Sequence, residues 1–222
     1  GDLRWIKGPQ TLAAIEQVEL AKAQRVILVT TPEARPTTVS GHLGQANLAK
    51  HIYDPLFGLL DGLRVMTMGQ ICEGMQSHGI AFQQVLQAVM VLVGSGHMLT
   101  VQNVDPSPEA ILRCARLNRF LANRARANGD IGYLVSPLTG GGVAVRRFEQ
   151  LFLLAMAEGH QSTSDIVRWT WALLSMQSQR FIKDGKALES DKDNINELTE
   201  QVDSFVQNRL QVMRALRISC VD

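Results

Sequence analysis

Residues 81–93 (AFQQVLQAVMVLV) carry apolar side chains around most of a helical turn, and this segment constrains the fold more than any other. A helix that is apolar on most faces is a buried helix, so other elements must cover it. Because Gln87 interrupts it and Gly94 ends it, it is shorter than the ~20 apolar residues of a membrane span. We therefore expect no membrane-spanning segment and a core that holds Val85, Val89 and Val93.

The elements around this segment follow the order of a winged-helix unit. Apolar periodicity predicts helices over residues 51–60 and, after an N-cap at Thr67, over residues 69–77. Residues 97–102 alternate like a strand. Two helices, a turn, a third helix and a strand give the succession typical of that unit.

Three further elements are predicted upstream. A 3.6-residue stripe favours a helix over residues 8–23, and the β-branched run RVILVT at 25–30 favours a strand. Two short strands around Gly41 and Gly44 predict a hairpin over 37–48. Pro106 and Pro108 then mark a boundary, so we expect a winged-helix-like subdomain at 1–104 and a helical subdomain with short strands at 105–222. The predicted fold class is α+β, predominantly helical.

The second subdomain is expected to be mostly helix. The pattern predicts an arginine-rich helix over 108–128, a strand over 131–135 and a loop over 136–142. Further helices are predicted over 146–157, 164–181 and 193–216. The last of them has one apolar stripe, formed by Ile195, Leu198, Val202 and Phe205.

The glycine run is the first candidate binding feature. Gly140, Gly141 and Gly142 lie between a predicted strand and a predicted helix, where backbone N–H groups can hold an anion. Arg146 and Arg147 could add positive charge, although the spacing is neither GxGxxG nor GxxxxGK. The simpler interpretation, which we favour, is a tight turn that needs positive φ.

A row of arginines is the second candidate. One predicted helix carries them without any acidic residue from 113 to 129, and an acidic partner or an RNA could dock there: Arg113, Arg116, Arg119, Arg124 and Arg126. The alternative that we favour is a solvated face that pairs with the acidic stretch 184–203, because such surface pairs are common and weak.

Binding to DNA is not expected. Affinity for DNA depends mostly on Lys and Arg contacts to phosphates, yet residues 65–112 contain neither, and the formal net charge is only +1. A free-standing helix-turn-helix regulator that binds nucleic acid remains the alternative function.

Catalytic and metal-binding patterns are missing from the sequence. The five histidines are far apart in the sequence. The three cysteines show no CxxC spacing, and this cysteine pattern is typical of a reducing, cytoplasmic location. Trp169 and Trp171, two apart on one predicted helix, point in different directions, so we expect one in the core and the other as an interface anchor.

Several strings resemble a known family. LVSPLTGGGVAVRRFEQLFLLAMAEG (134–159) closely resembles a signature of bacterial methyltransferases that carry a methyltransferase regulatory domain. The segments at 5–34 and 38–62 resemble the region before that signature, and 179–218 resembles the C-terminus of the family. Rickettsial-type protein lysine methyltransferases look like relatives that share this architecture.

The resemblance implies a class I S-adenosylmethionine-dependent core upstream and a non-catalytic region here that modulates it or presents substrate. Gly1 is interpreted as a residue left by cloning and Asp2 as an internal cut, so we expect the natural protein to continue upstream. Because no strand here is followed by the acidic and glycine-rich loop of such a core, we expect no cofactor in this chain. The expected partners are its own catalytic domain, a protein substrate or a second subunit.

Overall fold

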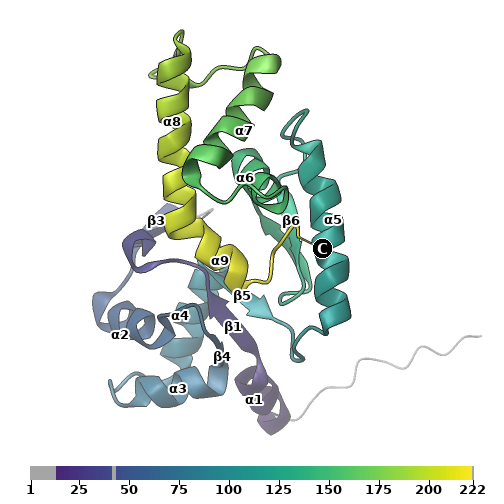
Figure 1. Cartoon of the computed structure of the whole chain (residues 1–222). Helices are drawn as coiled ribbons and strands as arrows, with labels where there is room; N and C mark the ends of the chain where they lie inside the picture. The colour runs from purple at the N-terminus through teal and green to yellow at the C-terminus, as the bar shows by residue number, and fades with distance from the viewer. Residues whose placement is uncertain (1–13, 42–43, 222) are drawn as a thin grey trace, which may run out of the picture. The chain divides into compact units, whose positions relative to one another are not determined.

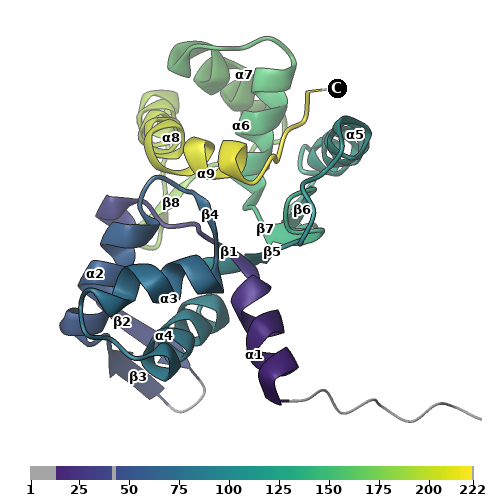
Figure 2. The same ribbon diagram turned by 90° about the horizontal axis from the view of Figure 1, so that it is seen from below.

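The computed structural model describes residues 14–41 and 44–221, in two compact units (Figures 1 and 2). Unit 1 comprises residues 1–28 and 34–103, and unit 2 comprises residues 29–33 and 104–222. Helices predominate and the strands are short and antiparallel, so the predicted α+β, mainly helical class is confirmed. The predicted helix over 8–23 is seen as α1 (Ala14–Ala23), and its first part lies outside the described residues.

Unit 1 is built on a three-stranded antiparallel sheet. Its order is β4 (Val65–Thr67), β1 (Arg25–Leu28) and β5 (Met98–Val101), with β1 in the centre. Residues 26–28 are buried on both faces, as suits a central strand. The sequence predicts β1 and β5 but not β4, because three half-buried residues are too few to show alternation.

Three helices share one apolar core with this sheet. They are α2 (Lys50–Leu60), α3 (Met68–Gln76) and α4 (Phe82–Gly94), each within one residue of its prediction at both ends. The Thr67 N-cap is confirmed: its hydroxyl accepts a bond from the Gln70 amide at 3.2 Å, and the Gln70 side chain accepts one from the Thr67 amide at 2.9 Å. Val85 and Val89 are buried as expected, and Val93 packs half-buried against the same core.

The hairpin predicted over 37–48 is also confirmed, as β2 (Thr38–Gly41) and β3 (Gly44–Asn47). The winged-helix comparison itself stays a prediction. The central strand of the sheet precedes the helices in sequence, and β5 leads into a helix instead of a second strand of a wing.

Unit 2 contains five α-helices and two small hairpins among the described residues. The helices are α5 (Pro108–Arg124), α6 (Arg147–Ala157), α7 (Thr163–Met176), α8 (Asp191–Ser204) and α9 (Leu210–Ala215). A π-helical segment, Phe205–Arg209, joins α8 to α9 in one continuous run (Figure 1). Of the predicted stripe on this run, Leu198, Val202 and Phe205 are buried, whereas Ile195 is only half-buried.

Two hairpins correct the sequence prediction. The loop predicted over 136–142 shrinks to a turn at 137–140: β6 (Tyr133–Ser136) pairs with β7 (Gly141–Ala144), and the glycines at the start of β7 hide its strand signal. The helix predicted to 181 ends at Met176, and the Asp184-Gly185 turn joins β8 (Ile182–Lys183) to β9 (Lys186–Ala187). Both turn residues have positive φ, as a tight hairpin requires. The helix predicted over 108–128 likewise ends earlier, at Arg124.

Buried polar side chains join the parts of unit 2. The Asn118 Oδ1 atom accepts a bond from the Val135 amide at 2.6 Å, and Nδ2 donates to the Val135 carbonyl at 2.8 Å, which fastens β6 to α5. The Ser136 hydroxyl donates to the Leu216 carbonyl at 2.6 Å. These bonds fix the strand that precedes the glycine run.

Candidate functional site

The glycine run forms the tip and one side of the β6–β7 hairpin. Gly140 has a φ of +71° and its amide donates to the Ser136 carbonyl at 2.9 Å, so the predicted tight turn is confirmed there. Gly141 and Gly142 face Ser136 and Val135 across the hairpin. Strand β7 separates the glycines from α6, and the glycine amides therefore do not open a helix as a phosphate-binding loop would.

Arg147 has a structural role, because its side chain forms hydrogen bonds within unit 2. Its half-buried guanidinium donates to the carbonyls of Ala125 and Arg126 and to Gln179 Oε1, at 2.8, 3.3 and 2.8 Å. Burial lowers the pKa of this arginine. Its donors satisfy the backbone at the end of α5.

Arg146 is exposed at the N-terminus of α6, beside a cleft of about 620 Å³. The first turn of α6 already holds a carboxylate, because Glu149 Oε2 accepts a bond from the Arg146 amide at 2.8 Å. Arg209 Nε lies 3.1 Å from Glu149 Oε1 and neutralises it. The position that an anion would take at this helix end is therefore occupied by Glu149.

The arginines predicted on one helix divide into those on α5 and Arg126, which follows its end. Arg113, Arg116 and Arg124 are exposed. Arg126 instead lies over the Trp169 ring, 5.0 Å from its centroid, and pairs with Glu158. The Trp169 indole donates to Glu158 Oε2 at 3.0 Å, so this tryptophan belongs to a local polar cluster and is not a core residue.

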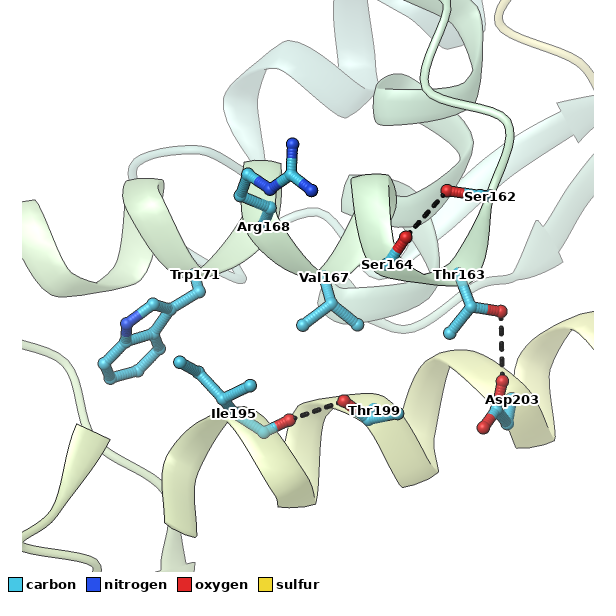
Figure 3. Close-up of a pocket in the computed structure, with 9 residues that line it drawn as sticks. All are labelled: Ser162, Thr163, Ser164, Val167, Arg168, Trp171, Ile195, Thr199 and Asp203. Atoms are coloured by element: carbon cyan, nitrogen blue, oxygen red, sulfur yellow. Dashed lines mark hydrogen bonds between the residues drawn. The ribbon is translucent and has the colours of Figure 1, made fainter. Parts of the chain in front are cut away.

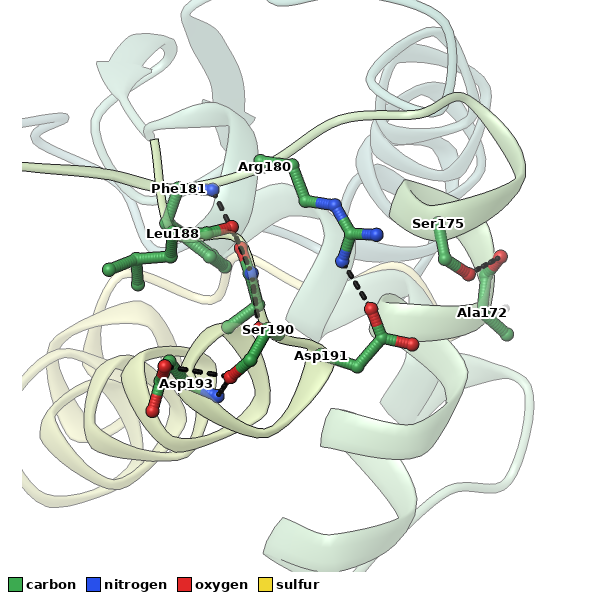
Figure 4. Close-up of polar contacts among 9 residues, drawn as sticks. Ala172, Ser175, Arg180, Phe181, Leu188, Ser190, Asp191 and Asp193 are labelled. Carbon is green, nitrogen blue, oxygen red and sulfur yellow. Dashed lines mark hydrogen bonds and ion pairs between the residues drawn. The ribbon is translucent and has the colours of Figure 1, made fainter. Parts of the chain in front are cut away.

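The expected pairing between these arginines and the acidic stretch 184–203 is wrong for Arg113 and Arg126. Arg113 pairs with Glu109 on its own helix at 3.2 Å. The acidic stretch takes other cations: Arg180 pairs with Asp191 (Figure 4), and Lys183 pairs with Glu197. The reason lies in which elements pack together. Helix α8 packs against α7, whereas α5 packs against α6 and β6.

A largely apolar groove lies between α7 and α8 in unit 2, and we call it the α7–α8 groove (Figure 3). Its volume is about 680 Å³. Side chains at a spacing of four residues line each helix: Thr163, Val167 and Trp171 on α7, and Ile195, Thr199 and Asp203 on α8. Val167, Trp171 and Ile195 point toward one another in the gap, which makes this end of the groove apolar.

The polar groups of the groove are already satisfied. Thr163 Oγ1 donates to Asp203 Oδ1 at 3.0 Å and closes one end, and Thr199 Oγ1 donates to the Ile195 carbonyl at 2.7 Å. The end formed by Val167, Trp171 and Ile195 therefore suits apolar side chains, which gain by leaving water, while the exposed Arg168 adds a positive charge to the groove lining.

Local contacts hold the groove walls in place. Serine hydroxyls cap both helices, Ser162 at α7 and Ser190 at α8, and each accepts an amide bond from the residue three positions on. The Arg180 guanidinium pairs with Asp191 (Figure 4). It also lies 5.2 Å from the Trp171 ring centroid, so it orients the indole.

The sequence marks Trp171 only as one of two candidates, with Trp169, for an interface anchor, and the expected core tryptophan is wrong because both are half-buried. The other lining residues are missed because a groove between two helices depends on their packing. The signal that could have found them is the repeated spacing of four on both helices, 163/167/171 and 195/199/203.

Residues 14–41 and 44–221 contain neither a metal site nor a membrane-spanning helix. No group of three His, Cys, Asp or Glu side chains is arranged to hold a metal ion. None of the helices there combines the length and apolar character needed to cross a bilayer.

Comparison with curated proteins finds similarity to the uncharacterized protein sll1526 of Synechocystis sp. (strain ATCC 27184 / PCC 6803 / Kazusa). The two are 26% identical over 215 residues. The match covers 97% of this chain and 42% of the relative, so the chain spans less than half of that protein's length. No family model and no solved structure matches.

Proposed function

We propose that this chain is the non-catalytic accessory region of a longer S-adenosylmethionine-dependent methyltransferase that acts on protein. In this proposal the α7–α8 groove holds a segment of polypeptide, either from the catalytic domain or from the substrate. The observation that carries it is the apolar end of the groove, where Val167, Trp171 and Ile195 converge between two capped helices. Concave apolar surfaces with a few placed polar groups are typical binding sites.

The methyltransferase part of the proposal is supported by the resemblance of residues 134–159 and 179–218 to the methyltransferase family. The greater length of the Synechocystis relative leaves room in such a protein for a catalytic core. The cofactor would bind to that core, and the present chain would contribute protein-binding surface.

The alternative of a nucleic-acid-binding regulator receives less support. The exposed side chains of α4 are glutamine and apolar, namely Gln83, Gln84, Gln87, Met90 and Val91. A surface without cations has little attraction for phosphates.

The test is methyl transfer by the longer natural protein from radiolabelled S-adenosylmethionine to a protein acceptor. We expect Trp171→Ala and Ile195→Ser to reduce transfer about tenfold, which corresponds to about 1.4 kcal/mol of binding, with unchanged cofactor affinity. Met176→Ala is the control, because Met176 is exposed at the end of α7 and does not line the groove. Full activity of both groove variants would refute the role of the groove.

The isolated chain separates the accessory role from an enzymatic one. Calorimetric titration with S-adenosylmethionine should give no saturable heat. Saturable binding at micromolar concentration would place the cofactor in this chain and contradict the proposal.

A further inference from the structure

The outer face of α5 is a second exposed surface, separate from the groove. At about 100° per residue, its five side chains fall within an arc of about 100° along the helix: Arg113, Arg116, Leu117, Phe120 and Arg124. We call these residues the α5 stripe. The opposite side of α5 is buried through Ala115, Asn118 and Ala122, so the stripe faces away from the unit that holds the helix.

The α5 stripe has an apolar centre and basic ends. Phe120 is 62% exposed and Leu117 is 45% exposed, and the arginines lie on either side of them along the helix. Protein interfaces are commonly built in this way, with a buried aromatic anchor and a charged rim in which arginine is enriched.

The positive charge of the stripe is not used within the described part of the chain. Arg116 and Arg124 make no hydrogen bond or ion pair with any described residue. Arg113 pairs with Glu109, but both side chains are at least 70% exposed, and such pairs contribute little. An acidic partner could therefore bind without first breaking a strong internal contact.

We infer that the α5 stripe docks an acidic amphipathic helix of a partner protein. Arg113 and Arg124 are 11 positions apart, about 16 Å along the axis, which sets the separation of the carboxylates on the partner. Between them the partner presents apolar side chains that cover Phe120 and Leu117. An RNA fits less well, because bases stack on aromatic rings and the stripe has one ring beside an aliphatic side chain.

The experiment uses the whole chain and two synthetic helical peptides of equal composition. The matched peptide carries glutamate pairs about 11 residues apart with leucines between them, and the control peptide has its glutamates in the centre. By fluorescence anisotropy we expect the matched peptide to bind at least about tenfold more tightly. Phe120→Ala and Arg124→Glu should each weaken its binding about tenfold, while Lys192→Glu, an exposed site on α8 that does not line the groove, leaves it unchanged.

Three results would overturn the inference. Equal binding of the two peptides would mean that the stripe is only a cationic surface. Tighter and strongly salt-dependent binding of oligouridylate would indicate RNA. Self-association of the chain that is lost in Phe120→Ala would make a second copy the occupant. All substituted positions are exposed, and a thermal melt of each variant checks that it is folded. Because this experiment does not involve the α7–α8 groove, a negative result would not count against the proposed function.

Discussion

At the residue scale, the side-chain amides of two buried asparagines form hydrogen bonds to backbone groups in unit 2. Asn194 is fully buried and serves three backbone groups: it accepts a bond from the Phe181 amide at 2.9 Å and donates to the carbonyls of Leu188 and Ser190 at 2.7 and 2.8 Å. Asn118 does the same for both polar groups of Val135. Such residues matter because an unpaired buried backbone group costs more than one hydrogen bond contributes.

The first prediction concerns Asn118. We expect Asn118→Ala to lower the free energy of unfolding by about 2–4 kcal/mol, because the Val135 amide and carbonyl lose their partners in a buried site. Asn123→Ala on the same helix is the matched control, since Asn123 is exposed, and it should stay within about 0.5 kcal/mol of the unmodified protein. Urea titration measures both. Equal effects of the two substitutions would contradict a stabilising role for the two hydrogen bonds between Asn118 and Val135.

The second prediction concerns Cys220, where burial raises the pKa of the thiol to about 12 from an ordinary value of 9.0. A raised thiol pKa stabilises the folded protein below pH 9 and loses that contribution as the pH rises from 9 toward 12. We therefore expect unfolding free energy to fall more steeply with pH above 9 than in Cys220→Ala, by about 1.4 kcal/mol per pH unit. Parallel pH profiles for the two proteins would show that the thiol is not buried.

At the scale of elements, the π-helical segment decides which side of the last helix meets the core. The Leu210 amide bonds the Phe205 carbonyl, five residues back, so the segment contains one residue more than an α-helix would. After it, Leu210, Val212 and Met213 are buried. The same segment brings Arg209 to Glu149 and, through Nη2, to the Ala144 carbonyl at 3.2 Å.

The third prediction is therefore a deletion. Removing Gln207 should convert the segment to α-helix and rotate α9 by about 100° against its core. We expect a loss of about 3 kcal/mol or more in unfolding free energy, as for the removal of large core side chains. Gln207→Ala keeps the chain length at an exposed site and should be nearly neutral. A deletion variant as stable as Gln207→Ala would show that the extra residue is dispensable.

At the scale of elements, the sequence predicts the features that depend on local signals and misses those that depend on packing. Helices α2, α3 and α4 are predicted to within one residue because caps such as Thr67 and apolar periodicity are local signals. Strand β7 is missed because its glycines acquire their structure from β6. The arginines of α5 are correctly marked as a charged face, but their partners depend on which helices pack together. The groove depends on the same packing, so of its lining residues only Trp171 is marked beforehand, as one of two candidate interface anchors.

At the scale of the whole molecule, unit 1 has a core of its own. Every buried residue of that core lies between Val26 and Met98 in the sequence. Its sheet is also complete within this range, apart from the last residues of β5. A fragment with these properties has what a small domain needs to fold.

The fourth prediction is that residues 1–103 fold alone. We expect a cooperative thermal transition by circular dichroism and no binding of a hydrophobic dye, because the fragment keeps the whole core of unit 1. Leu56→Asp, a charge placed at a fully buried position of that core, should abolish the transition. A gradual melt of the unmodified fragment, with dye binding, would mean that unit 1 needs the rest of the chain.

The bond from Ser136 to the Leu216 carbonyl spans 80 residues of sequence, and this imposes an order in time during synthesis. A ribosome adds about 5–20 residues per second, so Ser136 emerges about 4–16 s before its acceptor has been made. Unit 1 is finished long before, whereas the first elements of unit 2 must wait with their apolar surfaces uncovered. During these seconds α5 and the β6–β7 hairpin are made but still lack the last segment of unit 2 that packs with them.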